Sequence, residues 1–375
     1  MSQPIITYCG NVHPVVGLSD LEQYLDESTP SVQNHFGAKF PLGLWLPKTA
    51  MQDALSEKGL ASLRGRLETL ETMPVTFNAF PMEVFHGTRV KELVYTPDWS
   101  TRERLDYTKS VAQLGVKLGM KSFSISSLSG GFKPNDKAEK VTQYLEHWLQ
   151  WVDWARSLEE NESVRVSLAL EPEPFNTMED ESDAIQLWAK LREAAKVKGI
   201  SEEYLQRYLG LCFDTCHFSV RYVSLTEAWE RLKQHSIPVH KIQVSVAPRW
   251  QASMGEESRM KFFNWEEPVY LHQSFAKVAG QRQSFLDLDL AKRYEGKVEE
   301  WRTHFHVPIH FGHREDSTGF ELIDFLNYLK MHETEIPVLE VETYSFNSMG
   351  EQWGEQTSLE QSIAKEMLWL QEQMS

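Results

Sequence analysis

Cysteine is scarce in this sequence, and its scarcity narrows the class of protein. Only three cysteines occur among 375 residues, Cys9, Cys212 and Cys216. Their spacing fits neither a disulfide framework nor a zinc finger. Such a pattern is typical of a reducing compartment, where thiols stay free. We therefore do not expect cysteine to carry the chemistry.

Long apolar runs are also absent. No window reaches the roughly 18 uninterrupted apolar residues of a membrane span. The opening residues, MSQPIITYCGNVHP, lack a basic region followed by an apolar core and a cleavage site. We therefore expect a soluble, cytoplasmic protein with no membrane span.

Basic residues are fewer than acidic residues in this sequence. The chain has 38 Lys and Arg against 54 Asp and Glu, a formal net charge of -16, and no long basic run. A nucleic acid or an anionic membrane surface would meet net repulsion. We expect no nucleic-acid partner and a small-molecule metabolite instead; the oligomeric state stays open.

Short apolar runs alternate with amphipathic helical stretches along the chain, a pattern typical of β–α units around a parallel sheet. Eight such runs, with seven intervening helices and a terminal helix, predict an α/β fold: a single (β/α)8 TIM-barrel domain over residues 1–375. The predicted strands cover residues 5–11, 41–46, 74–80, 122–128, 165–172, 208–214, 239–247 and 336–344.

Two polar stretches are too long for ordinary loops. One, PMEVFHGTRVKELVYTPDW, follows the third predicted strand, and the larger covers residues 248–302. Both follow the carboxyl ends of strands, the face on which barrel enzymes build their active sites. We expect long insertions on this face, with residues 248–302 forming a lid or substrate clamp within the domain.

Acids and other polar residues end several predicted strands, although a barrel strand is buried and should be apolar. The parallel arrangement would bring these strand ends to one edge of the sheet. The motif HFHVP adds His304 and His306 there, and if this run is extended, their two-residue spacing points both imidazoles the same way. The residues are Glu171, Glu173, Asp214, His217, Gln243, His304, His306, Glu340 and Glu342.

Carboxylates and imidazoles from different strands would form an oxygen and nitrogen site for one divalent ion, such as Mn²⁺, Mg²⁺, Co²⁺ or Zn²⁺. Two glutamates beside it could move protons at a carbon next to a carbonyl. We expect Glu171 and Glu342 to be this catalytic pair. The expected metal ligands are Glu171, Asp214, Gln243, His306 and Glu342.

Each residue also has a plainer interpretation. Asp214 could cap a helix, and His217 could be a packing histidine. The prolines of EPEP could simply stiffen a turn, and 13 histidines produce some close pairs by chance. A shared polar site is favoured because one arrangement explains all of these strand ends together.

The same residues resemble a known superfamily. FDTCH is similar to the DTCH element of the xylose-isomerase-like TIM barrels, which include sugar isomerases, ketose epimerases and endonuclease IV. The resemblance implies that Asp214 is a metal ligand and that His217 lies beside it as a ligand or substrate contact. It also matches Glu171 and Glu342 to the glutamates that close the fifth and last strands.

Three departures from this superfamily bear on the metal. Gln243 stands where the seventh strand normally presents a histidine ligand, and His304 stands where endonuclease IV has the acid of an Asp-x-His pair that ends here in His306. The fourth strand ends in Ser126 and Ser127 instead of a histidine. The resemblance therefore implies one ion rather than a three-metal phosphodiesterase cluster.

A closer resemblance covers nearly the whole chain. The motifs are NVHP, FPMEVFHGTRVKELVYTPDW, LALEPEP, DTCH, YLHQ, HFHVP and LEVETY. In this order they resemble the EboE-type family, the xylose-isomerase-like member of a bacterial gene cluster associated with metabolite traffic. That resemblance implies a role in handling a secondary-metabolite or prenyl-type precursor, with partners from the same gene cluster.

The remaining polar residues near the predicted barrel mouth are expected to contact substrate. Cations after the third strand could hold a phosphate, carboxylate or polyol, although a solvated loop explains them equally well. The full substrate-binding set is His217, His304, His86, Arg89, Lys91, Asn11, His13, His272, Glu173 and Glu340.

We expect a metal-dependent isomerase or epimerase acting on a small polar or phosphorylated metabolite. Two alternatives stay open. A metal-dependent hydrolase would use the same ligands. A non-catalytic metabolite-binding protein would keep the barrel mouth as a pocket, and Gln243 is the residue that favours it.

Overall fold

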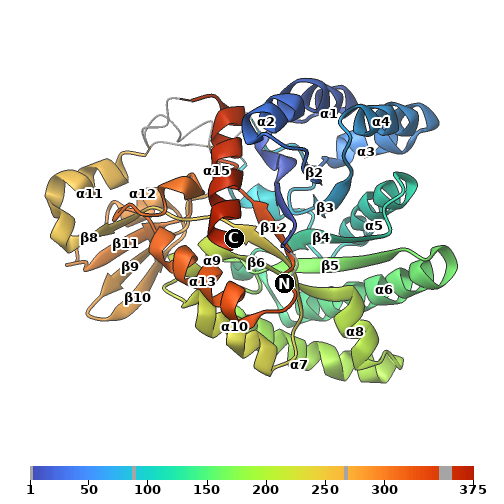
Figure 1. Cartoon of the computed structure of the whole chain (residues 1–375). Helices are drawn as coiled ribbons and strands as arrows, with labels where there is room; N and C mark the ends of the chain where they lie inside the picture. The colour runs from blue at the N-terminus through green and yellow to red at the C-terminus, as the bar shows by residue number, and fades with distance from the viewer. Residues whose placement is uncertain (1–2, 87–89, 266–268, 346–356) are drawn as a thin grey trace.

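The predicted TIM barrel is confirmed. The computed structural model describes residues 3–86, 90–265, 269–345 and 357–375. Its eight-stranded parallel sheet has the order β1-β12-β7-β6-β5-β4-β3-β2, with helices around it (Figure 1). The strands are β1 (Ile6–Tyr8), β2 (Leu42–Trp45), β3 (Pro74–Asn78), β4 (Ser122–Leu128), β5 (Arg165–Glu171), β6 (Leu209–Asp214), β7 (Val239–Val244) and β12 (Val338–Val341).

The helices follow the strands in the order that the apolar periodicity predicts. The long carboxyl-terminal helix α15 packs against α2, next to β1 and β12. The helices outside the 248–302 segment are α1 (Leu18–Gln23), α2 (Thr29–Phe36), α3 (Lys48–Leu55), α4 (Glu57–Thr69), α5 (Arg102–Lys117), α6 (Ala138–Glu162), α7 (Glu181–Lys198), α8 (Glu202–Tyr208), α9 (Thr215–Val220), α10 (Leu225–Gln234), α13 (Gly319–His332) and α15 (Leu359–Met374).

The seam between β1 and β2 brings the barrel close to closure. A parallel bridge joins Cys9 to Gly43 there. A Cβ atom at Gly43 would lie 2.2 Å from Oε1 of Glu340 and 2.6 Å from the carbonyl oxygen of Tyr8. Since real Cβ atoms do not approach other atoms so closely, a side chain at Gly43 would force the seam apart.

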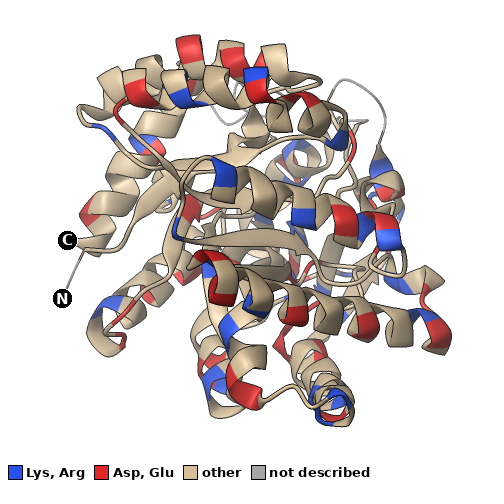
Figure 2. Cartoon of the chain, turned by 90° about the vertical axis from the view of Figure 1, so that its right-hand side faces the viewer, with Lys and Arg blue, Asp and Glu red and all other residues tan. Residues whose placement is uncertain are grey.

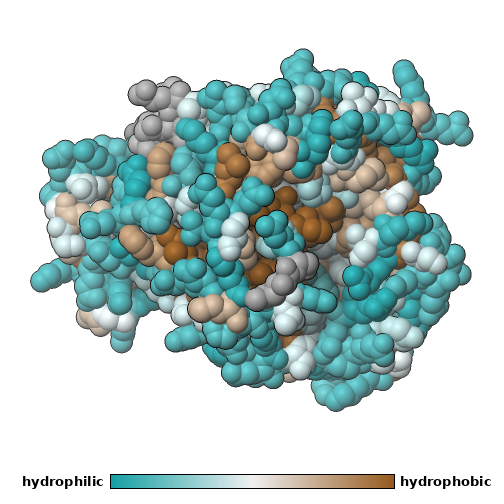
Figure 3. All heavy atoms as spheres, viewed as in Figure 1, coloured by the Kyte–Doolittle hydropathy of each residue, from teal (hydrophilic) through white to brown (hydrophobic). Residues whose placement is uncertain are grey.

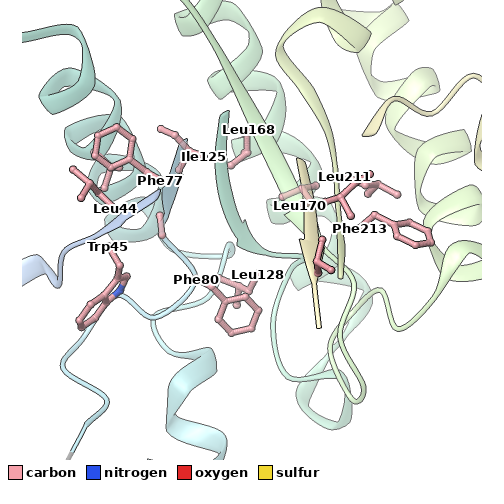
Figure 4. Close-up of a cluster of buried hydrophobic side chains, with 14 of the residues drawn as sticks. Leu44, Trp45, Phe77, Phe80, Ile125, Leu128, Leu168, Leu170, Leu211 and Phe213 are labelled. Atoms are coloured by element: carbon pink, nitrogen blue, oxygen red, sulfur yellow. The ribbon is translucent and has the colours of Figure 1, made fainter. Parts of the chain in front are cut away.

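Strand residues alternate between two faces, and apolar residues take the face that packs against the helices. Figure 4 shows part of this layer on β2 to β6. Phe213 of β6 stacks on Phe218 of α9 and Phe325 of α13, with ring centroids 4.3 and 5.2 Å apart. This layer of packed apolar side chains supplies the hydrophobic stabilisation that holds the helices on the barrel.

The face inside the barrel is polar. Lys241 of β7 reaches across it to Ser126 of β4, donating to Oγ at 3.0 Å. Its Nζ also lies 2.5 Å from Oε2 of Glu340 on β12. Lys241 and Glu340 are fully buried, so they can stay charged there only as a pair. The strand alternation thus directs polar side chains inward, up to the carboxyl end.

Residues 249–303 contribute a second, antiparallel sheet of order β10-β9-β11-β8. It lies to one side of the barrel, on the left in Figure 1, together with two helices. Its role as a lid stays a prediction, as does the assignment of the chain to one domain. The elements are β8 (Arg249–Gln251), α11 (Gly255–Phe263), β9 (Ser274–Val278), β10 (Gln281–Phe285), α12 (Leu288–Ala291) and β11 (Glu300–Thr303).

Charged residues of both signs are spread along the outer helices (Figure 2). The face seen in Figure 3 is mainly hydrophilic, with apolar residues showing between the elements. In the described part of the chain, no helix has the length and apolar character needed to cross a membrane.

Candidate metal centre

Three acids converge at the carboxyl end of the barrel. Glu171 ends β5, Asp214 ends β6, and Glu342 directly follows β12. One oxygen of each lies within 4.8 Å of an oxygen of the others, and all three side chains are buried. Carboxylates this close repel one another unless protons or a cation neutralise them. Within the described ranges, their ion-pair contacts are with histidines alone.

Three histidines meet beside these acids. The Nε2 atom of His304 lies 3.1 Å from Nε2 of His217 and 3.1 Å from Nε2 of His306. His217 comes from α9, whereas His304 and His306 follow β11, in the segment that returns from the second sheet to the barrel. All three are at most 3% exposed, and the ring nitrogens of His217 and His306 approach oxygens of the acids to 3.7–3.9 Å.

Each of these histidines donates a hydrogen bond from its other ring nitrogen. Nδ1 of His217 donates to the carbonyl oxygen of Pro172 at 2.9 Å, and Nδ1 of His306 donates to that of Glu342 at 2.9 Å. Nδ1 of His304 donates to Oε1 of Gln273 at 2.7 Å. Because oxygen can only accept here, each neutral ring carries its proton on Nδ1 and a lone pair on Nε2.

The three rings are neutral at physiological pH. Burial lowers the pKa of His306 to about 4, despite the nearby Asp214. Burial, together with the neighbouring imidazoles, holds the pKa of His304 well below its ordinary value, and burial also lowers the pKa of His217. Three Nε2 lone pairs therefore face one another at hydrogen-bond distance with no proton between them.

Asp214 has two roles, one for each oxygen. Oδ1 accepts from the backbone nitrogens of Cys216 and His217 at 2.8 and 3.2 Å, which caps α9, and from Oγ of Ser245 at 2.6 Å. Oδ2 is buried without a hydrogen-bond partner, 3.8 Å from Nε2 of His217 and 3.9 Å from Nε2 of His306. The capping and ligand interpretations of Asp214 are thus compatible.

This donor set fits a divalent metal ion. Ligand atoms of Asp214, His217 and His306 lie within 4.8 Å of one another, and Nε2 of His304 lies 3.1 Å from both histidines. Imidazole nitrogens with free lone pairs and a buried, unpartnered carboxylate oxygen suit borderline ions such as Zn²⁺, Co²⁺ or Mn²⁺. Oxygen acceptors fix the tautomer of each imidazole from behind, as metal-bound histidines require. Glu171, Asp214 and Glu342 form a neighbouring set of oxygen ligands that shares Asp214, so an ion could also be held by the acids.

The two glutamates of this site have raised pKa values. Burial and the neighbouring acids raise the pKa of Glu171 well above its usual value, and the same causes raise the pKa of Glu342. Oε2 of Glu171 is buried without a partner. Oε1 of Glu342 accepts from the amides of Asn11 and Asn78 at 2.7 and 3.3 Å. Both carboxyls therefore hold a proton to higher pH than an exposed glutamate does.

Other residues predicted for the site lie around this cluster. Burial raises the pKa of Glu173 to about 8, and its Oε1 lies 3.8 Å from Nδ1 of His304. His86 donates from Nε2 to the carbonyl oxygen of Asn11 at 2.6 Å, and the Lys91 ammonium lies 2.5 Å from Oδ2 of Asp287. Asn11, Lys91 and Glu173 line the cavity described below. Arg89 lies outside the described residues.

Four predicted residues lie away from the converging atoms. His13 stacks on Tyr24. His272 stacks on Phe305 with ring centroids 3.6 Å apart and donates to the His304 carbonyl at 3.0 Å. Glu340 pairs with Lys241 two residues deeper in the barrel than Glu342. The amide oxygen of Gln243 accepts from Sγ of Cys212 at 3.0 Å. Their predicted roles in binding substrate or metal stay predictions.

The sequence analysis missed several residues of the site. Gln273 is fully buried, and its Nε2 donates to the hydroxyl of Tyr95 at 2.8 Å. The other side of this amide therefore presents Oε1 to His304. Asn78 follows Thr76 at the two-residue step of an inward-facing strand position, a signal that could have identified it. Gln273 and Tyr95 lie in the motifs YLHQ and FPMEVFHGTRVKELVYTPDW, but no strand or helix periodicity singles out either residue.

One cavity opens onto the converging acids and imidazoles. It encloses about 580 Å³ of space and includes Glu171, His217, His304, His306 and Glu342 in its lining. The rest of the lining is largely apolar or aromatic. Those residues are Phe80, Pro81, Phe85, Val90, Val94, Tyr95, Tyr270, Leu271 and Tyr344.

No family model and no curated protein matches this sequence. Among solved structures, the chain is similar to a xylose-isomerase-like TIM-barrel protein from Mycobacterium smegmatis in complex with magnesium. The two are 10% identical, the match covers 100% of this chain and 97% of that one, and the TM-score is 0.54. A D-psicose 3-epimerase in the presence of D-fructose is 11% identical, with 98% and 96% covered and a TM-score of 0.50. At such low identity the likeness is one of fold, and the chain has the fold of xylose-isomerase-like TIM barrels.

Proposed function

We propose that this protein is a metal-dependent enzyme of the isomerase or epimerase type, acting on a small metabolite at the carboxyl end of the barrel. One observation carries the proposal. Three neutral imidazoles and two glutamates with raised pKa values line one cavity, and the unpartnered oxygen of Asp214 lies beside two of the imidazoles. The magnesium-bound neighbour and the epimerase neighbour of the same fold agree with this chemistry.

His217, His304, His306 and Asp214 would hold the ion. A nitrogen-rich set favours zinc, cobalt or manganese over magnesium. A bound divalent ion polarises a substrate carbonyl or hydroxyl and makes the adjacent C–H bond more acidic. In this proposal Glu171 and Glu342 act as the proton carriers, although the sequence analysis also counted them, with Gln243, among the ligands.

The glutamates would exchange a proton with the substrate carbon. One of them, ionised, accepts the proton, and the other, protonated, returns a proton at the same or the neighbouring carbon. Burial and the neighbouring acids raise both pKa values, so each carboxyl holds a proton to higher pH than an exposed glutamate does. Asn11 and Asn78 orient the Glu342 carboxyl through Oε1.

Exchange of substrate hydrogen with solvent tests this mechanism. Metal-loaded protein in D₂O should place deuterium on the carbon next to the carbonyl of a suitable hydroxy-carbonyl compound, read by NMR over a panel of such compounds. Glu171→Gln and Glu342→Gln should lower that rate at least 100-fold with metal content unchanged. The exposed Glu203→Gln on α8 is the matched control. Full exchange in either site variant would exclude that glutamate as a proton carrier.

A metal-dependent hydrolase is the second candidate. The meeting of three neutral imidazole nitrogens favours it, because three histidines are a known ligand set for a catalytic zinc ion with water. Reaction in H₂¹⁸O separates the two candidates. A hydrolase places solvent oxygen in its product, whereas an isomerase or epimerase exchanges hydrogen without breaking the substrate into two parts.

A role in handling a secondary-metabolite or prenyl-type precursor belongs to the same proposal. It is supported by the EboE-type motifs, several of which supply residues of the cavity: NVHP contributes Asn11, LALEPEP contributes Glu171 and Glu173, and LEVETY contributes Glu342. Co-purification with products of the same gene cluster would test this part separately from the chemistry.

A further inference from the structure

The cavity has two chemically different ends. At one end lie the imidazoles and acids, and at the other lie apolar side chains from the segment between β3 and α5 and from residue 271. Phe80 and Phe85 are 7% and 4% exposed, and Leu271 is 7% exposed. The apolar end is formed by Phe80, Pro81, Phe85, Val90, Val94 and Leu271.

Aromatic hydroxyls near the apolar end already have protein partners. The Tyr95 hydroxyl accepts from Nε2 of Gln273 at 2.8 Å. The Tyr270 hydroxyl donates to Nδ1 of His86 at 2.9 Å, since Nε2 of that ring carries the proton given to Asn11. A ligand hydroxyl placed at this end would compete with these bonds.

The amide and the cation of the lining are likewise engaged. Asn78 donates to Glu342 and to Sγ of Cys9, and its Oδ1 accepts from the backbone nitrogen of Phe80 at 2.8 Å. Lys91 is the one Lys or Arg among the described lining residues, and its Nζ lies 2.5 Å from Asp287. The buried, unpartnered oxygens of the described lining are Oδ1 of Asn11 and Oε2 of Glu171 and Glu173, which lie at the acids and imidazoles. The apolar end therefore offers few free partners for a row of hydroxyls, and the described lining has no unpaired Lys or Arg for a phosphate.

The apolar wall continues towards the protein surface. Pro81, Phe85, Val90 and Val94 also line a second depression on the other side of this wall. Leu93, which faces that depression, is 64% exposed. A ligand with an apolar part can therefore gain contact area against Pro81, Phe85, Val90 and Val94, where a polyol would lose hydration without replacement.

We propose that the substrate is an amphiphile, with one chelating oxygen head, such as a hydroxy-carbonyl group, and an aliphatic or aromatic body, rather than a free sugar or a sugar phosphate. The head would lie against His217, His304, His306 and Asp214, a placement that rests on the proposed function. The body would lie against Phe80, Phe85, Val90, Val94 and Leu271. Each buried methylene should tighten binding about fourfold.

A homologous series of ligands tests the inference. The probes are hydroxyacetone, 1-hydroxy-2-hexanone, 1-hydroxy-2-octanone, 2-hydroxyacetophenone and D-fructose, and binding to the zinc-loaded full chain is measured by calorimetry. From the three-carbon to the six-carbon hydroxyketone the dissociation constant should fall at least tenfold, and 2-hydroxyacetophenone should also bind more tightly than hydroxyacetone. A dissociation constant that is flat along the series, or D-fructose as the tightest ligand, would overturn the inference.

A pair of neighbouring variants locates the apolar body. Val94→Asn faces the cavity and should reduce the gain per methylene, whereas Leu93→Asn, on the outer side, should leave it unchanged. Thermal unfolding of both variants confirms that they fold. Equal effects of the two variants would contradict the placement.

The same experiment separates this inference from the proposed function. Metal content is measured on every preparation. A chain-length dependence in protein that binds no metal would keep the amphiphilic ligand and remove the metal mechanism. A dissociation constant that does not change along the series, in protein that binds metal, would keep the metal mechanism and remove the amphiphilic ligand.

Discussion

Nδ1 of His304 lies 2.7 Å from Oε1 of Gln273, which directly precedes β9 in the insertion after β7. The amide cannot turn over without loss, because its Nε2 donates to Tyr95 at 2.8 Å and faces the Pro174 carbonyl at 3.2 Å. Gln273 therefore fixes the tautomer in which His304 presents a lone pair to His217 and His306.

Replacing Gln273 should weaken metal binding without touching a ligand. In Gln273→Leu the acceptor for Nδ1 of His304 is lost, and we expect zinc affinity to fall by about 10- to 100-fold. Gln273→Glu keeps an acceptor and should retain more of the affinity. Competition with a fluorescent chelator measures both, with the exposed Gln281→Leu of β10 as the matched control. Equal affinities in all three variants would refute this role.

Asp214→Asn should separate the cap from the ligand. The amide keeps an Oδ1 acceptor for Cys216, His217 and Ser245, so the start of α9 is preserved. The charge on Oδ2 is lost, so bound metal, measured by elemental mass spectrometry, should fall at least tenfold. Asp214→Ala should also lose the cap, which costs about 1 kcal/mol of stability. Metal content unchanged in Asp214→Asn would remove Asp214 from the ligand set.

His13 should make the protein sensitive to acid. Burial lowers its pKa to about 4, and the side chain is 4% exposed. The unfolded state binds a proton below about pH 6.5, whereas the folded state resists protonation until about pH 4. His13 therefore contributes stability above pH 6.5 that is lost as the pH falls towards 4, up to about 3 kcal/mol.

Removing the His13 imidazole measures its contribution to the free energy of unfolding. Urea unfolding at pH 7 and pH 4 should show a smaller loss of stability in His13→Gln than in the wild type. The exposed His35→Gln on α2 should behave like the wild type. If all three proteins lose the same free energy of unfolding, His13 does not titrate as its surroundings indicate.

The buried Lys241 and Glu340 should each depend on the other for the stability of the fold. Lys241→Met leaves the Glu340 carboxylate uncompensated in the barrel and should cost about 3–5 kcal/mol of stability. The double variant Lys241→Met with Glu340→Gln removes both charges and should recover part of that loss. Denaturant unfolding of the two variants checks the coupling. A double variant less stable than Lys241→Met would contradict it.

Much of the fold was predictable because local patterns determine it. The apolar runs matched all eight barrel strands, as in β4, which spans Ser122–Leu128 as expected. The strand ends also predicted which acids would meet, since Glu171, Asp214 and Glu342 do converge. In parallel strands, residue order alone places the carboxyl ends on one side.

Depth inside the barrel was harder to predict. Side chains alternate along a strand with a two-residue period, which indicates that Glu340 and Glu342 share the inward face. These residues nevertheless differ in depth along the barrel by about 6.6 Å. Glu340 therefore meets Lys241, whereas Glu342 meets the histidines. The tautomers were not predictable either, because the acceptors on Pro172, Gln273 and Glu342 come from separate parts of the chain.

Anomalous X-ray diffraction from crystals of the zinc-loaded protein tests the central claim most directly. We predict one peak between the Nε2 atoms of His217, His304 and His306 and Oδ2 of Asp214, at about 2.0–2.2 Å from each. The absence of a peak at that position, or a peak bound by Glu171 and Glu342 alone, would contradict the account.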